Sequence, residues 1–202
     1  MIKISLLDTH ILILQTRYLI LKKDMKKIFN RFRLQSGFAR LKQEISKMSR
    51  KNRSVSLSSA QNIGILVSIQ NEKELQEAEI LDTQLKKEHK KVKLMGFLFD
   101  KTIKLSPNSN IEIISPEDIE WNYVPKNEKI VNFINNEFDI LINLCTEVCF
   151  PLVYITALSK SLFKVGAYDK RNSAFYDFMV ETQQHSISGF SAELKYYLDK
   201  IK

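Results

Sequence analysis

The sequence predicts an α/β protein: a three-layer α/β/α sandwich with a Rossmann-like, mostly parallel sheet, preceded by a basic N-terminal helical arm. Two observations support this prediction. Residues 138–165 have the pattern of a strand, a helix and a second strand in a length typical of a parallel crossover unit. Basic residues are concentrated between Lys22 and Arg53, where twelve lysines and arginines are opposed by only two acidic residues.

The segment before the sheet is predicted to form a helix and then a linker. Across an arm at residues 25–53, apolar residues recur at steps of three and four, which indicates one amphipathic helix, or two with a hinge at Ser36–Gly37. The polar, serine-rich segment Arg53–Gln61 follows, and we place the domain boundary there. The α/β domain is then expected at residues 62–202.

Residues 1–24 precede this arm. They are apolar but carry charges such as Asp8 and Arg17, so they are too polar for a membrane-spanning helix, which needs about 20 mostly apolar residues. They also lack the small-residue cleavage site of a signal peptide. Two interpretations are open: a native segment, or a non-native extension upstream of a start at Met25. A peptide containing Thr9 in the native protein would exclude the second.

Strands and helices are predicted to alternate within the α/β domain. Short apolar runs rich in β-branched residues indicate strands, and longer runs with apolar residues every three to four positions indicate helices. The predicted strands are residues 63–68, 92–99, 111–114, 138–144, 162–165 and 175–180. The predicted helices are residues 70–89, a single turn opened by Ser115, 127–138, 149–160 and a last helix capped by Ser188 or Ser191.

The positive charge of the chain belongs to the arm. The whole chain carries a net charge of +8, and residues 22–53 carry +10, so the remainder sums to −2. An isoelectric point of 9.3 therefore does not indicate a basic face on the α/β domain. The basic residues predicted to bind a partner are Lys26, Lys27, Arg31, Arg33 and Arg40.

Three interpretations of the arm are open. It could dock on an anionic membrane surface, contact the phosphates of a nucleic acid, or pack its apolar stripe on the domain and leave the lysines and arginines in water. The leading prediction is a non-catalytic binding or adaptor module that docks through the arm on an anionic partner, which would be a membrane surface, a protein complex or RNA. With only two cysteines, the protein is expected to be cytoplasmic, with peripheral association at the inner membrane as an option.

An alternative prediction is a small-molecule or nucleotide-binding enzyme. In an open parallel sheet, ligands lie outside the carboxyl ends of the strands. The side chains predicted to bind a ligand there are Asn143, Thr146, Glu147, Asp169, Lys170 and Arg171. Against this alternative, the five glycines are scattered and form no phosphate-binding loop, so no cofactor is predicted.

Cys145 and Cys149 also fall at this edge. Their C-x-x-x-C spacing differs from the C-x-x-C of redox dithiols, and three isolated histidines do not complete a zinc site. Small buried side chains are the favoured interpretation of both cysteines. No metal site and no catalytic residue are predicted.

Several short motifs together resemble a domain-of-unknown-function family found in Bacteroidota, the one numbered 6913. They include Lys26-Lys-Ile-Phe29, Ile63-Gly-Ile-Leu66 and Ile119-Glu-Trp-Asn122, and above all Ile155-Thr-Ala-Leu-Ser-Lys160 leading into Phe163-Lys-Val-Gly166. The resemblance runs from about Met25 to the C-terminus. It implies one small cytoplasmic α/β protein and supplies no activity or catalytic residue.

Overall fold

The computed structural model of the protein describes the backbone of residues 6–106 and 109–201, and the side chains of residue 25, 27–106 and 109–201. Its centre is a six-stranded sheet in the order β3-β2-β1-β4-β5-β6, in which every pair of neighbours is parallel. The strands are β1 (Asn62–Ile69), β2 (Lys91–Leu98), β3 (Glu112–Ile114), β4 (Ile140–Asn143), β5 (Phe163–Ala167) and β6 (Phe178–Val180). The predicted parallel sheet is confirmed.

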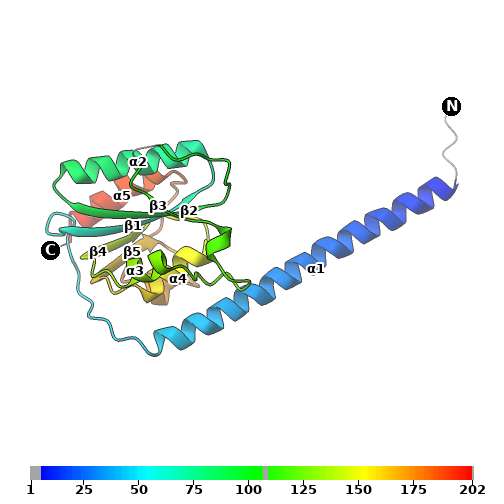
Figure 1. Cartoon of the computed structure of the whole chain (residues 1–202), viewed down its shortest axis with the longest axis horizontal. Helices are drawn as coiled ribbons and strands as arrows, with labels where there is room; N and C mark the ends of the chain where they lie inside the picture. Colours follow the sequence, from blue (N-terminus) through cyan, green and yellow to red (C-terminus); the bar gives the residue numbers. More distant parts are fainter. Residues whose placement is uncertain (1–5, 107–108, 202) are drawn as a thin grey trace.

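Helices cover both faces of this sheet (Figure 1). The helices of the described residues are α1 (Leu6–Ile45), α2 (Glu72–Lys87), α3 (Glu128–Ile134), α4 (Phe150–Leu158) and α5 (Ile187–Leu198), with 3₁₀ turns η1 (Pro116–Asp118) and η2 (Ser173–Phe175). Helices α2 and α5 lie on one face and α3 and α4 on the other, so the predicted α/β/α sandwich is confirmed.

The crossover predicted at residues 138–165 lies in the interior of the sheet. Strand β4 pairs with β5 from Ile140 opposite Phe163 to Asn143 opposite Gly166, and with β1 on its other side. Because β4 is buried on both faces, its sequence is continuously apolar up to Asn143 rather than alternating. Gly64 of β1 lets the ring of Phe138 pack closely against the strand, because a Cβ atom at this position would lie 2.8 Å from that ring.

Helix α4 is enclosed on all sides, and all nine of its residues are buried. Leu152 and Ile155 pack with the core between the helix and the sheet. Phe150 and Tyr154 pack in a separate cluster with Leu41 of α1. Helix α1 therefore forms an additional layer outside α4, which explains why the sequence of α4 is apolar on every side.

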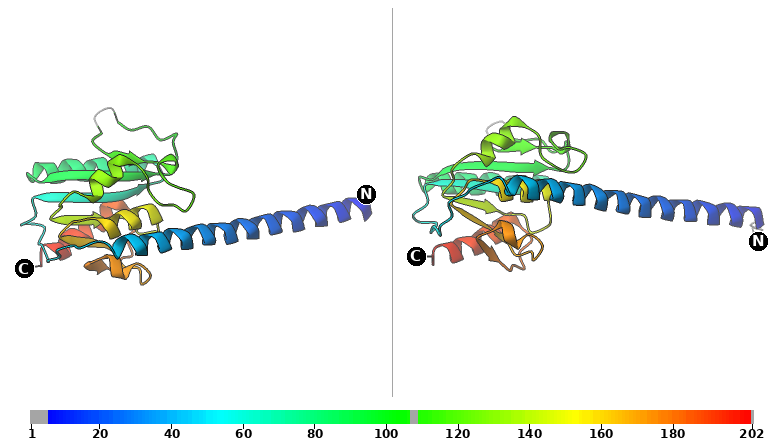
Figure 2. Two further views of the ribbon diagram at one scale, coloured as in Figure 1. Left: turned by 60° about the horizontal axis from the view of Figure 1, so that its bottom comes forward. Right: turned by 90° about the horizontal axis from the view of Figure 1, so that it is seen from below.

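Helix α1 runs without interruption from Leu6 to Ile45, which agrees with the single helix and excludes the alternative of two helices with a hinge at Ser36–Gly37. Gly37 serves close packing instead: a Cβ atom there would lie 2.4 Å from the carbonyl oxygen of Asn122 and 2.8 Å from the ring of Phe150. The N-terminal part of α1 extends away from the α/β body (Figures 1 and 2).

Two predicted boundaries at the C-terminal end are wrong. Helix α5 is capped by Ser186, whose Oγ accepts a hydrogen bond from Gly189 N–H at 3.1 Å, whereas Ser188 and Ser191 lie inside the helix. The last strand begins at Phe178 rather than at residue 175, because Ser173–Phe175 forms a 3₁₀ turn. At the helix, three nearby serines could each have been the cap, and at the strand, the apolar residues of the 3₁₀ turn resemble the start of a strand.

The direction in which successive strands are added to the sheet reverses between β1 and β4. The loops that follow these two strands, residues 70–71 and 144–149, therefore meet at the carboxyl edge, the usual ligand position in an open parallel sheet.

Candidate functional site

The structure places the six ligand-binding residues predicted at the carboxyl edge in two groups. Four of them line one small cavity of about 30 Å³: Asn143, Thr146, Glu147 and Asp169. Lys170 and Arg171 are exposed and do not line it. A cavity of this size holds about one water molecule.

Two of these four residues, Asn143 and Asp169, already have hydrogen-bond partners. Asn143 Nδ2 donates to Tyr176 Oη at 2.9 Å and to Thr156 Oγ1 at 3.2 Å. Asp169 accepts two hydrogen bonds from the Arg171 guanidinium, which help to lower the pKa of this carboxyl. Among the described buried side chains, Asn172 Oδ1 is one of the few polar atoms without a partner. Ligand binding by these six residues remains a prediction, and a cavity of about 30 Å³ leaves little room for a ligand.

The start of α2, at the end of β1, is occupied by its own side chains. Asn71 Oδ1 accepts from Glu74 N–H at 3.0 Å, and Glu74 Oε2 accepts from Gln70 N–H at 2.7 Å. In nucleotide-binding folds, free amides at this position bind phosphate. Here a carboxylate already takes one of those amides and would repel an anion.

The two cysteines lie together where β4 leads into α4. Cys149 is buried at the start of the helix and Cys145 is partly buried. The hydrogen bond between the two thiols lowers the pKa of Cys145, and the same bond together with burial raises the pKa of Cys149. Both side chains pack in the core between α4 and the sheet, as expected for small buried residues.

A much larger groove opens on the α1 side of the same edge, with a volume of about 750 Å³. The end of β2 contributes Phe97 and Phe99, the loop before α3 contributes Trp121, and the start of α4 contributes Val148 and Phe150. Trp121 and Val148 remain 52% and 48% exposed, so the wall is apolar and open to solvent. Sequence analysis missed this groove because its walls come from segments far apart in the chain.

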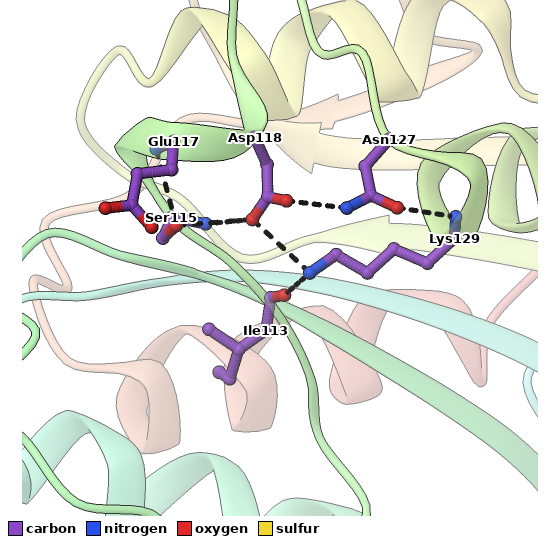
Figure 3. A network of polar contacts seen from close by, with 6 residues as sticks. All are labelled: Ile113, Ser115, Glu117, Asp118, Asn127 and Lys129. Atoms are coloured by element: carbon purple, nitrogen blue, oxygen red, sulfur yellow. Dashed lines mark hydrogen bonds and ion pairs between the residues drawn. The ribbon is translucent and has the colours of Figure 1, made fainter.

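One wall of the groove is held by a network of polar contacts around Asp118 (Figure 3). Asp118 accepts hydrogen bonds from Ser115 N–H at 2.9 Å and Asn127 Nδ2 at 2.6 Å, and pairs with Lys129 Nζ at 3.3 Å. Lys129 also donates to the carbonyl oxygen of Ile113. Partial burial acts to raise the pKa of Asp118, but these hydrogen bonds and the lysine charge together lower it. The ionised carboxylate thus fixes the loop that carries Trp121.

The projecting part of α1 begins beside this groove and carries an exposed apolar stripe. Met25, Ile28, Phe29 and Phe32 are 70%, 69%, 57% and 58% exposed. Their spacing of three and four residues puts them on one side of the helix. Phe32 stacks on Trp121 with ring centroids 6.0 Å apart, so the stripe continues into the apolar wall of the groove.

The five basic residues predicted to bind a partner differ in their surroundings. Arg40 donates to both carboxylate oxygens of Glu120 at 2.9 Å and to Glu44 at 3.1 Å. Arg33 donates to the carbonyl oxygen of Trp121, and its guanidinium lies 4.1 Å from the centre of the Tyr123 ring. Lys27 and Arg31 are exposed and form no ion pair with any described residue. The side chain of Lys26 lies outside the described residues.

Within the described residues, every helix is too short or too polar to cross a membrane. No curated protein and no solved structure matches the chain. A family model does match, over residues 33–201, and it covers the sheet, the packed part of α1 and the groove lining except Asn30 and Arg31. The chain therefore belongs to the family of unknown function DUF6913, as its motifs indicated.

Proposed function

We propose that this protein is a non-catalytic binding module that docks on an anionic membrane surface through the N-terminal part of α1. The observation that carries the proposal is the exposed stripe of Met25, Ile28, Phe29 and Phe32 on a helix whose other exposed residues include Lys27 and Arg31. A helix with apolar residues on one side and lysine and arginine on the other is typical of binding in the plane of a membrane interface.

The exposed apolar residues favour a membrane over RNA. Binding to nucleic-acid phosphates needs cations and gains nothing from an exposed isoleucine or methionine. At a membrane surface these side chains leave water, and each nearby lysine or arginine adds about 1 kcal/mol of attraction to anionic lipid. The concentration of +10 in residues 22–53, against −2 elsewhere, fits such a surface.

The test is co-sedimentation of the full chain with vesicles of phosphatidylcholine, with and without phosphatidylglycerol. We expect binding only to the vesicles with phosphatidylglycerol, and binding that weakens as salt is added. The double variant Ile28→Ser/Phe29→Ser should bind at least tenfold more weakly, because two apolar side chains no longer enter the interface. Equal binding to both kinds of vesicle, or to neither, would contradict the proposal.

Two matched controls distinguish binding through this surface from nonspecific binding to vesicles. Ile80→Ser removes an isoleucine of similar exposure, 56%, from α2 on the opposite side of the sheet, and should leave vesicle binding unchanged. Lys27→Gln should weaken binding about fivefold, whereas Lys93→Gln, at an exposed position of β2, should not. Retention on RNA that survives Ile28→Ser/Phe29→Ser but is lost in Lys27→Gln would favour a nucleic acid instead.

A further inference from the structure

The 750 Å³ groove is large enough to be a ligand site in its own right. Sites for small molecules have volumes of about 300–1,000 Å³ and are lined mainly by apolar and aromatic side chains with a few polar groups. This groove also lies at the carboxyl edge of a parallel sheet. Its position and size are those of a binding site.

The lining of the groove identifies the chemistry of its ligand. Phe97 forms the buried floor, and Phe99, Trp121 and Val148 are exposed on the walls. Phe97 and Phe99 contact each other edge to face with ring centroids 4.8 Å apart. A polar ligand would lose its hydration here without gaining hydrogen bonds, so the occupant must be apolar along most of its length.

The rim of the groove identifies the charge of the ligand. Arg31 and Arg33 both line it, and Arg31 is exposed. The one acidic side chain of the lining, Glu120, is already paired with Arg40 through both of its oxygens. The uncompensated charge at the rim is therefore positive, and an anionic group there would be attracted.

We propose that the groove binds a long-chain carboxylate, with its acyl chain along Phe99, Trp121 and Val148 and its carboxylate near Arg31. The proposal rests on the proposed membrane function only for the source of the ligand. An acyl chain could pass from a membrane to the groove because the apolar stripe of α1 is continuous with the groove through Phe32 and Trp121. Binding itself requires no membrane.

The experiment uses the single tryptophan of the chain, Trp121, as a reporter. The full chain is titrated with 11-(dansylamino)undecanoic acid below its critical micelle concentration, and energy transfer from Trp121 to the dansyl group is measured. We expect saturable transfer that hexadecanoate displaces. Dodecanoate should displace more weakly, since each buried methylene strengthens binding up to about fourfold.

Val148→Glu should weaken binding of the probe at least tenfold, because a carboxylate enters the apolar wall. Its matched control is Val131→Glu on α3, at a valine that is 52% exposed and outside the groove, which should bind like the unchanged protein. Val148→Phe should also weaken binding by filling the groove, and it keeps the test valid if Val148→Glu unfolds, because Trp121 remains the single tryptophan.

Arg31→Gln tests the head group: it should raise the dissociation constants of the probe and of hexadecanoate severalfold and leave that of methyl hexadecanoate unchanged. Absence of energy transfer, or equal losses in Val148→Glu and Val131→Glu, would overturn the proposal. So would dimerisation of the chain that Val148→Glu abolishes and that excludes the probe, because a second copy would then be the occupant.

One variant distinguishes binding of the probe in the groove from binding of the chain to vesicles. Ile28 and Phe29 do not line the groove, so Ile28→Ser/Phe29→Ser should lose vesicle binding and retain the probe. If that variant lost both to the same extent, the groove would not be a site distinct from the stripe, and the acyl-chain assignment would fail.

Discussion

The two parts of α1 have similar compositions and opposite surroundings. From Leu34 to Ile45, the apolar side chains pack on α4 and the loop beside it. From Met25 to Phe32, they are exposed. At 3.6 residues per turn, Phe32 and Leu34 project about 200° apart, so the apolar stripe changes sides within half a turn. One continuous helix thus presents one side to its own domain and the other side to solvent, and only the second is available to a partner.

The largest expected effect is a difference in the free energy of unfolding between variants in the packed and in the exposed part of α1. Leu41 is fully buried against α4, so Leu41→Ala should lower the free energy of unfolding by about 3 kcal/mol through lost burial and the cavity left behind. Ile28→Ala should change it by less than about 0.5 kcal/mol. Urea denaturation followed by circular dichroism measures both. A loss of comparable size in Ile28→Ala would mean that the projecting part also packs within the chain.

The second prediction uses Lys164, which the packed part of α1 helps to cover. Lys164 lines a cavity with Ile45, Met48 and Arg50 and donates to the carbonyl oxygen of Ala157 at 2.7 Å. Burial, assisted by the charge of Arg50 and opposed by Asp177, lowers the pKa of Lys164 to about 7.

Between pH 7 and the ordinary lysine pKa of 10.5, the unfolded state therefore binds the proton that the folded state has released, so the contribution of Lys164 to stability rises with pH in this window. From pH 7 to 9.5 the unchanged protein should gain about 3 kcal/mol relative to Lys164→Met. Urea denaturation at three pH values measures the difference. Parallel pH profiles of the two proteins would show that the lysine is not shielded as described.

The third prediction concerns the contact that lets α1 approach the body. Alanine is normally favoured over glycine in a helix by about 1 kcal/mol. At Gly37, however, the new Cβ would meet the Asn122 carbonyl at 2.4 Å, so Gly37→Ala should destabilise by about 2 kcal/mol. In Gly189→Ala the nearest atom is the movable end of the Gln184 side chain at 2.6 Å, and the capping Ser186 Oγ lies at 2.8 Å, so the change should destabilise less than Gly37→Ala. Thermal denaturation compares the two, and a stabilising Gly37→Ala would argue against the tight contact.

The smallest expected effect distinguishes two arginines on the same helix. Arg40 is partly exposed and paired with Glu120 and Glu44, so Arg40→Gln should cost only about 0.5 kcal/mol of stability and leave vesicle binding nearly unchanged. Arg31→Gln should leave stability unchanged and weaken vesicle binding about fivefold. If Arg40→Gln weakened vesicle binding and Arg31→Gln did not, the packed part of α1 would carry the docking charge, which would contradict the proposal. Denaturation and co-sedimentation measure the two effects.

The sheet was predictable because its evidence is local and repeated. The apolar runs of β1, β4 and β5 and the helix between the last two identify a parallel crossover without any knowledge of distant contacts. The layer formed by α1 was not predicted, although α4 carried a signal: a helix that is apolar all round needs cover on both sides. The alternative of a hinge at Gly37 was excluded only by the structure, because a glycine that permits close packing has the same local appearance as one that permits bending.

The groove could not be predicted because it depends on tertiary structure. Leu34, Phe97, Trp121 and Val148 share no spacing in the sequence, and their proximity follows only from the strand order and from α1 crossing α4. The carboxyl edge itself was predictable, but only four of the six side chains expected to act there line the small cavity at that edge. What the sequence alone did indicate was the separation of charge between the arm and the domain.

The uninterrupted course of α1 has a mechanical consequence. The helix is fixed to α4 by Leu41 and Phe38 and by the contact at Gly37, and it continues as a straight rod into the projecting part (Figure 2). If that rod lies flat on a bilayer, the body cannot swivel about it. The protein would then stand in a single orientation, with the mouth of the groove always at the same height and angle above the lipid.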